Sequence, residues 1–337
     1  MSLLAQNCPP QRVRFGLAAR LSLTLIGAAA LVFVTAFYYD YRESRQYMLD
    51  ISQEVLTELS AAIVNGLDMM QKDVEAVAVE VARGLKEGDT GPELRKRALD
   101  AIASSQNCQG VTVRIAATQD QPDRPVLYCH RSRLRVVCGD LEAADALLAT
   151  LPRDDLIVDP SAAMDWSEPQ IPPNQSEPVT SYEAPVYRES TTGPVRIGTV
   201  SARLTLAHLS TAVERLRLFQ SGYVIVLSRQ GRYLSYPDYS DQEWAGRGSI
   251  FERAHVNPDP QQQVIGDRMT RGETGFMPFL SSYLDYQPAH IHFAPLPGSG
   301  WSIGVVFADS ELFAPMNALA RHIVLIGSAG LAFLLVL

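Results

Sequence analysis

The chain has 337 residues, of which 47% are hydrophobic and 20% are charged, and its net charge is −8. An acidic balance with no basic cluster to offset it excludes nucleic acid as the expected partner. Once two apolar stretches near the ends are set aside, about 275 residues remain, enough for one large core or two smaller ones.

The first apolar stretch, residues 21–39, contains no charged residue. As a helix it spans roughly 28 Å, close to the thickness of the hydrocarbon core of a bilayer. Arg12, Arg14 and Arg20 precede it. This basic excess predicts that residues 1–20 are cytoplasmic and that the chain is outside the membrane from residue 40. A cleavable signal peptide is the alternative, but the run exceeds the usual signal core of about 7–15 residues.

The second apolar stretch, residues 323–337, is too short to span a bilayer by itself. It reaches that length by including residues 316–322 or by continuing past residue 337. We therefore expect a two-pass membrane protein, with a cytoplasmic N-terminus, a second span at 316–337 and residues 40–315 outside the cytoplasm. We also expect a cytoplasmic part to follow residue 337.

Residues 40–90 have the pattern of one long helix. Apolar residues recur every three or four positions, which predicts a stripe made of Met48, Ile51, Val55, Leu59, Ile63, Leu67, Met70, Val74, Val77 and Val81. Such a stripe must pack on its own domain, on a second copy of the chain, or on both. A shorter helix is predicted at 93–104.

From residue 111 onward the pattern is mainly that of strands. Period-two alternation and turn residues predict strands at 111–115, 125–129, 134–137, 179–187, 195–206, 223–228, 232–236, 275–279, 289–294 and 301–307. Short helices are predicted at 141–151 and 207–219, and 166–178 reads as a proline-rich surface loop. The expected fold is α+β, with a long N-terminal stalk helix, two tandem antiparallel-sheet modules and two flanking transmembrane helices.

Three of the four cysteines lie outside the cytoplasm on this topology. Cys129 and Cys138 fall on two segments that can pair as neighbouring strands, and an oxidising compartment permits a disulfide there. The alternative is that both are reduced and buried. The spacing of the cysteines matches no metal site.

Several short segments, taken in order, resemble the double Cache sensor domains of bacterial transmembrane receptors. For the membrane-distal module they are residues 166–169, 180–187, 197–200, 204–206 and 209; for the membrane-proximal module they are 222–231, 236–238, 274–275 and 300–306. The resemblance covers roughly residues 40–312, and it implies PAS-like modules at 91–206 and 207–312 behind a stalk at 40–90. It also implies a cytoplasmic output domain, and we expect a homodimeric receptor of a bacterial inner membrane. The N-terminal 80 residues look most like receptors with a sigma-factor-regulating serine phosphatase, although kinases, cyclases and chemotaxis receptors share this sensor.

Four residues are candidates for contact with a ligand. Trp166, Tyr182 and Tyr187 can line a distal pocket, while a core position is the alternative for Trp166 and Tyr182. Glu168 is expected to fix a loop. Arg203 departs from the family, because amino-acid-sensing members carry an aspartate there that holds the ligand's amino group. We therefore expect no sensing of free α-amino acids through that motif. Arg203 can instead grip a carboxylate or phosphate, the alternative being an exposed arginine.

The sequence gives no sign of an external active site. It contains no G-x-S-x-G, H-E-x-x-H or phosphate-cradling glycine loop, and no cofactor is expected. His290 and His292 can face the same way on a strand, but with no third ligand nearby we expect them to be solvated or core residues. A small-molecule receptor is thus the leading hypothesis. The alternatives are a membrane-anchored enzyme or binding protein, and a ligand-free dimerisation spacer.

Overall fold

The computed structural model describes residues 17–87, 89, 91–115, 124–132, 135–139, 156–157, 165–171, 177–188, 195–215, 221–237, 246–256 and 259–336. The helix expected at 141–151 and Cys8 lie outside these residues. The chain divides into two compact units, one formed by Met1–Ser52 with Leu312–Leu337 and the other by Gln53–Glu311. Each unit is described separately below.

The first unit contains two helices that are long and apolar enough to cross a membrane. One is the beginning of α1 (Leu17–Glu87), and the other is α8 (Ala314–Val336). At 23 residues, α8 is roughly 34 Å long. The most apolar stretches of both helices are unburied within the protein, as membrane-facing segments would be.

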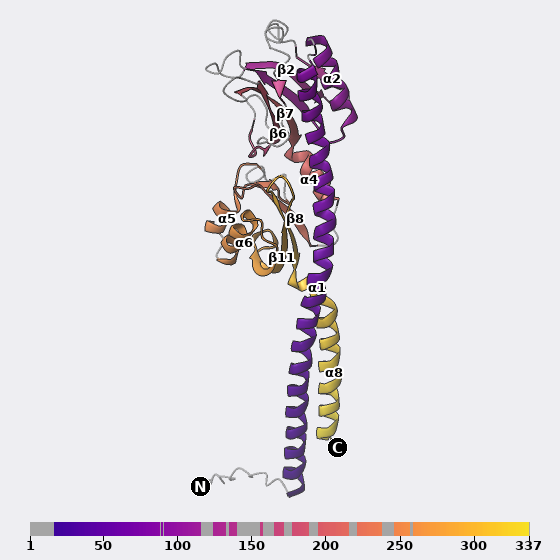
Figure 1. The fold of residues 1–337 in the computed structure, drawn as a ribbon. Coiled ribbons are helices and arrows are strands. Elements are labelled where there is room, and N and C mark those ends of the chain that lie inside the picture. Colours follow the sequence, from indigo (N-terminus) through magenta and orange to yellow (C-terminus); the bar gives the residue numbers. More distant parts are fainter. Residues whose placement is uncertain are drawn as a thin grey trace, which may run out of the picture. The chain divides into compact units, whose positions relative to one another are not determined.

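The predicted stalk is the continuation of α1, which runs for 71 residues without a break (Figure 1). No proline interrupts this segment, so nothing in the sequence forces a kink between the apolar stretch and the stalk. In the second unit, the predicted stripe is buried from Ile63 to Val81, with Leu67 and Val74 in between. This stripe is the face that packs on the two sheets.

The N-terminal part of the predicted apolar stripe was assigned to the wrong side of the helix. Ile51 and Val55 are 39% and 49% exposed, whereas Leu56 and Ser60 are each only 1% exposed. A serine is stable on the buried side because its Oγ makes a 2.7 Å hydrogen bond with His292 Nδ1. An apolar pattern has no means of identifying a hydroxyl that is buried with a partner.

The first sheet has the strand order β3-β2-β1-β7-β6-β4, with β5 also paired to β6, and all its pairs are antiparallel. Helix α2 (Gly91–Ser104) precedes it and α4 (Leu206–Glu214) follows it. The strands are β1 (Gly110–Ile115), β2 (Arg124–Ser132), β3 (Arg135–Cys138), β4 (Leu156–Ile157), β5 (Asp165–Trp166), β6 (Val179–Arg188) and β7 (Val195–Thr205).

A disulfide joins Cys129 and Cys138, which face each other on β2 and β3. A further cysteine, Cys108, is reduced and buried, and this burial raises the pKa of its thiol to about 11. The disulfide alternative from the sequence is therefore confirmed, and Cys108 is a poor nucleophile.

Removing the disulfide should weaken the first sheet measurably. The bond closes a loop of 9 residues, for which the chain-entropy relation gives about 2–3 kcal/mol. We expect the Cys129→Ala/Cys138→Ala double variant to lose that much unfolding free energy in urea titrations. A reductant should reproduce the loss in the wild-type chain and have no effect on the variant. Equal stability of the two chains without reductant would contradict the prediction.

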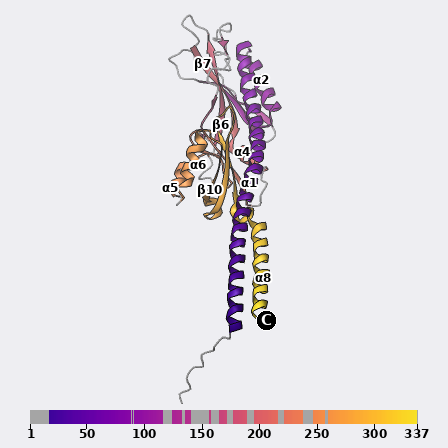
Figure 2. The same ribbon diagram turned by 60° about the horizontal axis from the view of Figure 1, so that its bottom comes forward.

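The second sheet has the antiparallel order β10-β11-β12-β8-β9. Its strands are β8 (Tyr223–Leu227), β9 (Tyr233–Ser235), β10 (Gly275–Ser281), β11 (Gln287–Pro295) and β12 (Ser302–Ala308). Between β9 and β10 the chain forms two helices that the sequence did not predict, α5 (Ile250–Val256) and α6 (Gln261–Thr270). They cover the face of this sheet that is turned away from α1 (Figures 1 and 2).

Helices α5 and α6 pack tightly because a glycine lies where they meet. A Cβ atom at Gly266 would lie 2.8 Å from a methyl carbon of Ile250 and 3.0 Å from the ring of Phe251. Ile265 and Met269 flank this glycine in α6 and enter the core of the second sheet. The proline-rich linker and the shortness of both helices hide this pair from periodicity analysis.

Candidate functional site

The first sheet has two chemically different faces. Along β7, Val200, Ala202 and Leu204 point to one side and are completely buried. Ser201 and Arg203 alternate with them and so point to the other side. We call the first side the helix face, because it packs against α1, and the second side the Arg203 face.

Two of the four candidate residues lie on the helix face. Tyr182 is paired with Ala202, and Trp166 is paired with Tyr182. Trp166 is only 5% exposed, and its Nε1–H donates a 2.9 Å hydrogen bond to Glu75 of α1. Trp166 therefore occupies a core position and is not part of a surface loop. The predicted loop character of this segment was wrong at this residue.

Trp166 also contacts the second sheet. Its ring meets the ring of Trp301, the residue before β12, edge to face with 4.9 Å between centroids, and it lies 5.7 Å from the ring of Tyr182. A single side chain thus touches the stalk helix and both sheets. We call Trp166, Glu75, Tyr182 and Trp301 the tryptophan joint.

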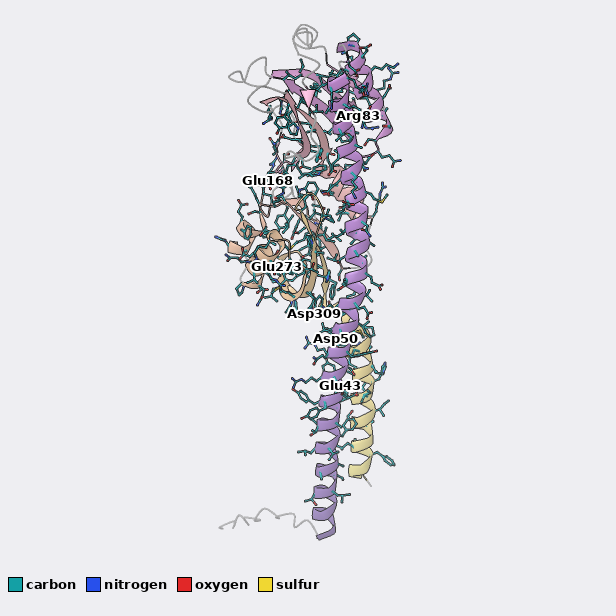
Figure 3. All side chains as sticks on the ribbon, in the orientation of Figure 1. Glu43, Asp50, Arg83, Glu168, Glu273 and Asp309 are labelled. Carbon is teal, nitrogen blue, oxygen red and sulfur yellow. A yellow bond between two sulfur atoms is a disulfide. The ribbon has the colours of Figure 1, made fainter. Side chains whose placement is uncertain are left out.

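Polar contacts on either side of Trp166 hold the joint together. Asp165 forms an ion pair with Arg229, whose Nε also donates to the Ser299 carbonyl at 2.7 Å. Glu168, which is labelled in Figure 3, accepts hydrogen bonds from Ser228 Oγ at 2.6 Å and from the Gln230 N–H at 3.3 Å. The expectation that Glu168 fixes a loop is therefore confirmed.

Arg203 is half-buried on the opposite face, with two interactions that orient it. Its Nη2 donates a 2.7 Å hydrogen bond to Thr112 Oγ1. Its guanidinium also lies 4.6 Å from the centre of the Tyr128 ring, a cation–π contact. The alternative from the sequence, that Arg203 is an exposed and solvated side chain, is therefore wrong. Within the part of the chain that the structure describes, this guanidinium uses one of its five N–H groups in a side-chain hydrogen bond, so the others can donate to an anion.

Two further polar groups near Arg203 escaped the sequence analysis. The ring of His130 stacks on that of Tyr128 with 5.2 Å between centroids. Both His130 Nδ1 and Ser201 Oγ are buried, and neither has a hydrogen-bond partner among the described residues. Buried polar atoms without partners are uncommon and destabilising in a protein that has no ligand for them. Gly110 of β1 pairs with Arg203 on one side and with His130 on the other. The register of β1 with its two neighbours would therefore have placed His130 near Arg203.

The other charged groups on this face also matter for a ligand. Glu183 faces Ser201 across the β6–β7 pair and so gives the Arg203 face a carboxylate. Val186 of β6 is buried on the helix face. Tyr187 follows it in the strand and therefore points to the Arg203 face, as Glu183 does. It stands near the end of the strand, beyond a bulge that follows Val186. The structure therefore brings Trp166 together with Tyr182, and separates both of them from Arg203 and Tyr187.

The second sheet has a cluster of tyrosines under α5 and α6. Burial raises the pKa of Tyr223 and Tyr233 far above the ordinary range, and Tyr223 makes a 2.8 Å hydrogen bond with Ser281. Arg253 lies 4.4 Å from the centre of the Tyr236 ring. The cavity they line has a volume of about 20 Å³, which is room for about one water molecule. This cluster is a packed core.

His290 and His292 are core residues, one of the alternatives from the sequence. His292 is 3% exposed and contacts both Ser60 Oγ and Thr57 Oγ1 of α1. His290 Nδ1 lies 2.6 Å from a carboxylate oxygen of Asp309, just after β12. No group of three metal-ligating side chains occurs in the part of the chain that the structure describes. Both histidines therefore have structural partners.

His292 should make stability fall in mild acid. Burial lowers its pKa below the ordinary value of 6.5, so the unfolded chain takes up a proton at a higher pH than the folded chain. Stability is then complete above pH ~6.5 and decreases as the pH falls from there toward the lowered pKa. In urea titrations between pH 7.5 and 5.5, His292→Gln should lose less stability than the wild type. Parallel profiles would contradict this, and His208→Gln tests the same effect at a half-buried histidine whose pKa is also lowered by desolvation.

Comparison with known proteins gives a likeness of fold only. No protein-family model and no curated protein matches the chain. Among solved structures, the extracellular domain of mmHK1S-Z3, named as a histidine kinase, is 15% identical with a TM-score of 0.60; the match covers 80% of this chain and 98% of that one. The periplasmic sensory domain of the Campylobacter jejuni chemoreceptor Tlp1 is 10% identical, with a TM-score of 0.56 and coverages of 80% and 99%.

A third solved structure is the ligand-binding domain of the Pseudomonas aeruginosa amino acid chemoreceptor PctB in complex with L-Arg. It is 17% identical with a TM-score of 0.51, and the match covers 80% of this chain and 93% of that one. The α+β fold of this chain, with a long N-terminal helix followed by antiparallel sheets, is thus similar to the folds of these three sensor and ligand-binding domains.

Proposed function

We propose that the protein is a two-pass receptor of a bacterial inner membrane, whose double Cache domain binds a small molecule. Residues 91–206 form the membrane-distal module of this proposal and residues 207–312 the membrane-proximal one. The support is the sensor fold together with two helices of membrane-spanning length. The N-terminus is cytoplasmic and residues 40–315 are outside the cytoplasm, as the basic residues before the first span favour.

The observation that carries the ligand-binding proposal is the arrangement around Arg203. A guanidinium fixed by Thr112 and Tyr128 lies on the same face as two buried polar atoms, Ser201 Oγ and His130 Nδ1, that have no partner among the residues that the structure describes. A carboxylate or phosphate would pair with the guanidinium and accept a further hydrogen bond from Ser201. The proposed ligand is therefore a small anion, which binds the Arg203 face of the distal module.

Glu183 bears on whether the ligand is a simple anion or an amino acid. It gives the same face a carboxylate opposite Ser201, so an amino acid with both charges would use Glu183 together with Arg203. We propose that the ligand is a simple anion, because Arg203 stands where amino-acid-sensing members of the double Cache family carry an aspartate that binds the amino group. The binding of L-Arg by the PctB domain is a property of that protein.

Signalling is proposed to reach a cytoplasmic output domain through the tryptophan joint and the two spans, with a serine phosphatase as the preferred output. A second copy of the chain is the proposed partner of the stalk. Ile51, Val55 and Met69 support this, because they are 39%, 49% and 72% exposed on α1 although apolar. The extracytoplasmic domain is not proposed to be an enzyme.

The test is a thermal-shift screen of the full chain in detergent micelles. A ligand that binds only the folded state raises its melting temperature by linkage. The screen compares monocarboxylates, dicarboxylates, inorganic phosphate, simple amines and amino acids at matched ionic strength. We expect an anion without an amino group to raise the melting temperature. Stabilisation by amines or amino acids alone would overturn the assigned ligand class, and no stabilisation by any class would favour the spacer hypothesis.

A further inference from the structure

A groove between α1 and α8 lies within the first unit, apart from the sensor sheets. Phe37 and Tyr41 of α1 and Ala320, Arg321, Val324 and Leu325 of α8 line it, and its volume is about 530 Å³. We infer that this groove binds one anionic phospholipid of the surrounding bilayer. The inference rests on the part of the proposed function that places both helices in a membrane.

The groove is closed at two levels by contacts between the helices. At one end, Tyr41 OH donates a 3.2 Å hydrogen bond to Asn317 Oδ1, and beyond it the Arg45 guanidinium lies 4.9 Å from the centre of the Phe313 ring. At the other end the ring of Phe33 lies against Gly327, where a Cβ atom would be only 2.8 Å from it. Phe33 and Tyr41 are eight residues apart, or roughly 12 Å along the helix. These contacts between the helices mark the two ends of the groove.

The lining changes from polar to apolar along α8. Asn317, Arg321 and Leu325 follow one another at four-residue spacing, so they lie on one stripe of the helix. Asn317 and Arg321 come at the start of the predicted span, at the level of the headgroups, and Val324 and Leu325 come deeper. A phospholipid changes from polar to apolar in the same order, from its phosphate to its acyl chains. The two ends of the groove therefore match the two parts of a lipid.

Charge decides which occupant fits. Arg321 is the one charged residue among those that line the groove, and none of them is a carboxylate. A helix from a second copy packed here would bury this guanidinium in an apolar contact, which is costly without a partner. A lipid phosphate pairs with it directly, and a net negative headgroup is favoured over a zwitterionic one. Exposed Leu319 and Ile326 lie outside the groove, so they remain available to a second copy.

The experiment is native mass spectrometry of the full chain in micelles, with equimolar phosphatidylglycerol and phosphatidylcholine of identical acyl chains. We expect one retained lipid and a preference for phosphatidylglycerol of roughly fivefold, as for one arginine at a membrane surface. Arg321→Gln should abolish the preference. The control Arg42→Gln, which removes an exposed arginine of α1 outside the groove, should keep it. Ala320→Phe, which fills the groove, should reduce the retention of both lipids.

Several results would overturn the inference. These are the absence of a preference in the wild type, an unchanged preference in Arg321→Gln, and an equal loss in both arginine variants, which would indicate general surface charge. If Ala320→Phe changes the oligomeric mass and leaves lipid retention intact, the groove is a contact between protein chains. Arg203→Ala should keep the lipid preference, so failure of the anion-sensing proposal is distinguishable from failure of this one.

Discussion

Replacement of Trp166 by alanine is expected to destabilise the second unit by about 3–5 kcal/mol, the usual cost of truncating a large buried aromatic side chain. The variant loses the edge-to-face contact with Trp301 and the contact with Tyr182, and it leaves the Glu75 carboxylate without its 2.9 Å indole donor. Urea titration of the full chain in micelles, followed by far-ultraviolet circular dichroism, measures this loss. It should be accompanied by broadening or splitting of the transition, because the two sheets lose a shared contact.

Trp166→Phe separates packing from hydrogen bonding at the same position. Phenylalanine keeps much of the ring contact but cannot donate to Glu75, so we expect a smaller loss, about 1–3 kcal/mol. A single sharp transition should persist in this variant. If Trp166→Ala cost less than 1 kcal/mol, Trp166 would not be the residue that joins the stalk and the two sheets.

Replacement of Arg203 by alanine is expected to weaken binding of the stabilising anion by roughly 10- to 100-fold, the equivalent of about 1.5–3 kcal/mol for a hydrogen bond to a charged group. The physical reason is that the fixed guanidinium supplies both the charge and the donors for the anion. Titration calorimetry of the full chain measures the change in Kd. Arg203→Lys should bind with intermediate affinity, because it keeps the charge but loses the planar donor geometry.

Arg114 provides the matched control for this experiment. It is an exposed arginine on β1. Because it pairs with Thr199 of β7, it lies on the Arg203 face, but four positions along β1 from Gly110, the residue that pairs with Arg203. Arg114→Ala removes the same charge from the same sheet, so an effect of net charge would appear in both variants. We expect an unchanged Kd in Arg114→Ala. Equal weakening in the two variants, or none in Arg203→Ala, would refute the role assigned to Arg203.

Much of the fold was predictable because it depends on periodicity. Strands β6, β7, β8, β11 and β12 lie close to their predicted positions. Polar and apolar side chains alternate along β6 and β7, which gives a period of two. By contrast, β8 and β12 are buried at every position and appear in the sequence as short apolar runs between turn residues. Helices α5 and α6 were missed, because each has three turns at most and a proline-containing linker separates them. The stalk was predicted as a helix, but its buried side was misplaced around Ser60, where a hydroxyl is buried against His292.

The candidate site was less predictable, because it depends on which residues share a face. Alternation along β7 correctly separated Arg203 from Val200 and Leu204. It could not show that Trp166 and Tyr182 lie across the sheet from Arg203, because that requires the register between β5, β6 and β7. The same missing register hid Thr112, Tyr128 and His130, which come from strands 70 or more residues before Arg203. Whether Trp166, Tyr182, Tyr187 and Arg203 contact a ligand stays a prediction.

The central claim, that an anion binds the Arg203 face of the first sheet, is tested most directly by hydrogen–deuterium exchange of the full chain with and without the stabilising anion. Bound ligand should slow exchange of amides in strands β1, β2 and β7, which carry Thr112, Tyr128, His130, Ser201 and Arg203. Amides in β8, β9, α5 and α6 should change less. Protection centred on the tyrosine cluster of the second sheet, with the first sheet unaffected, would contradict the claim.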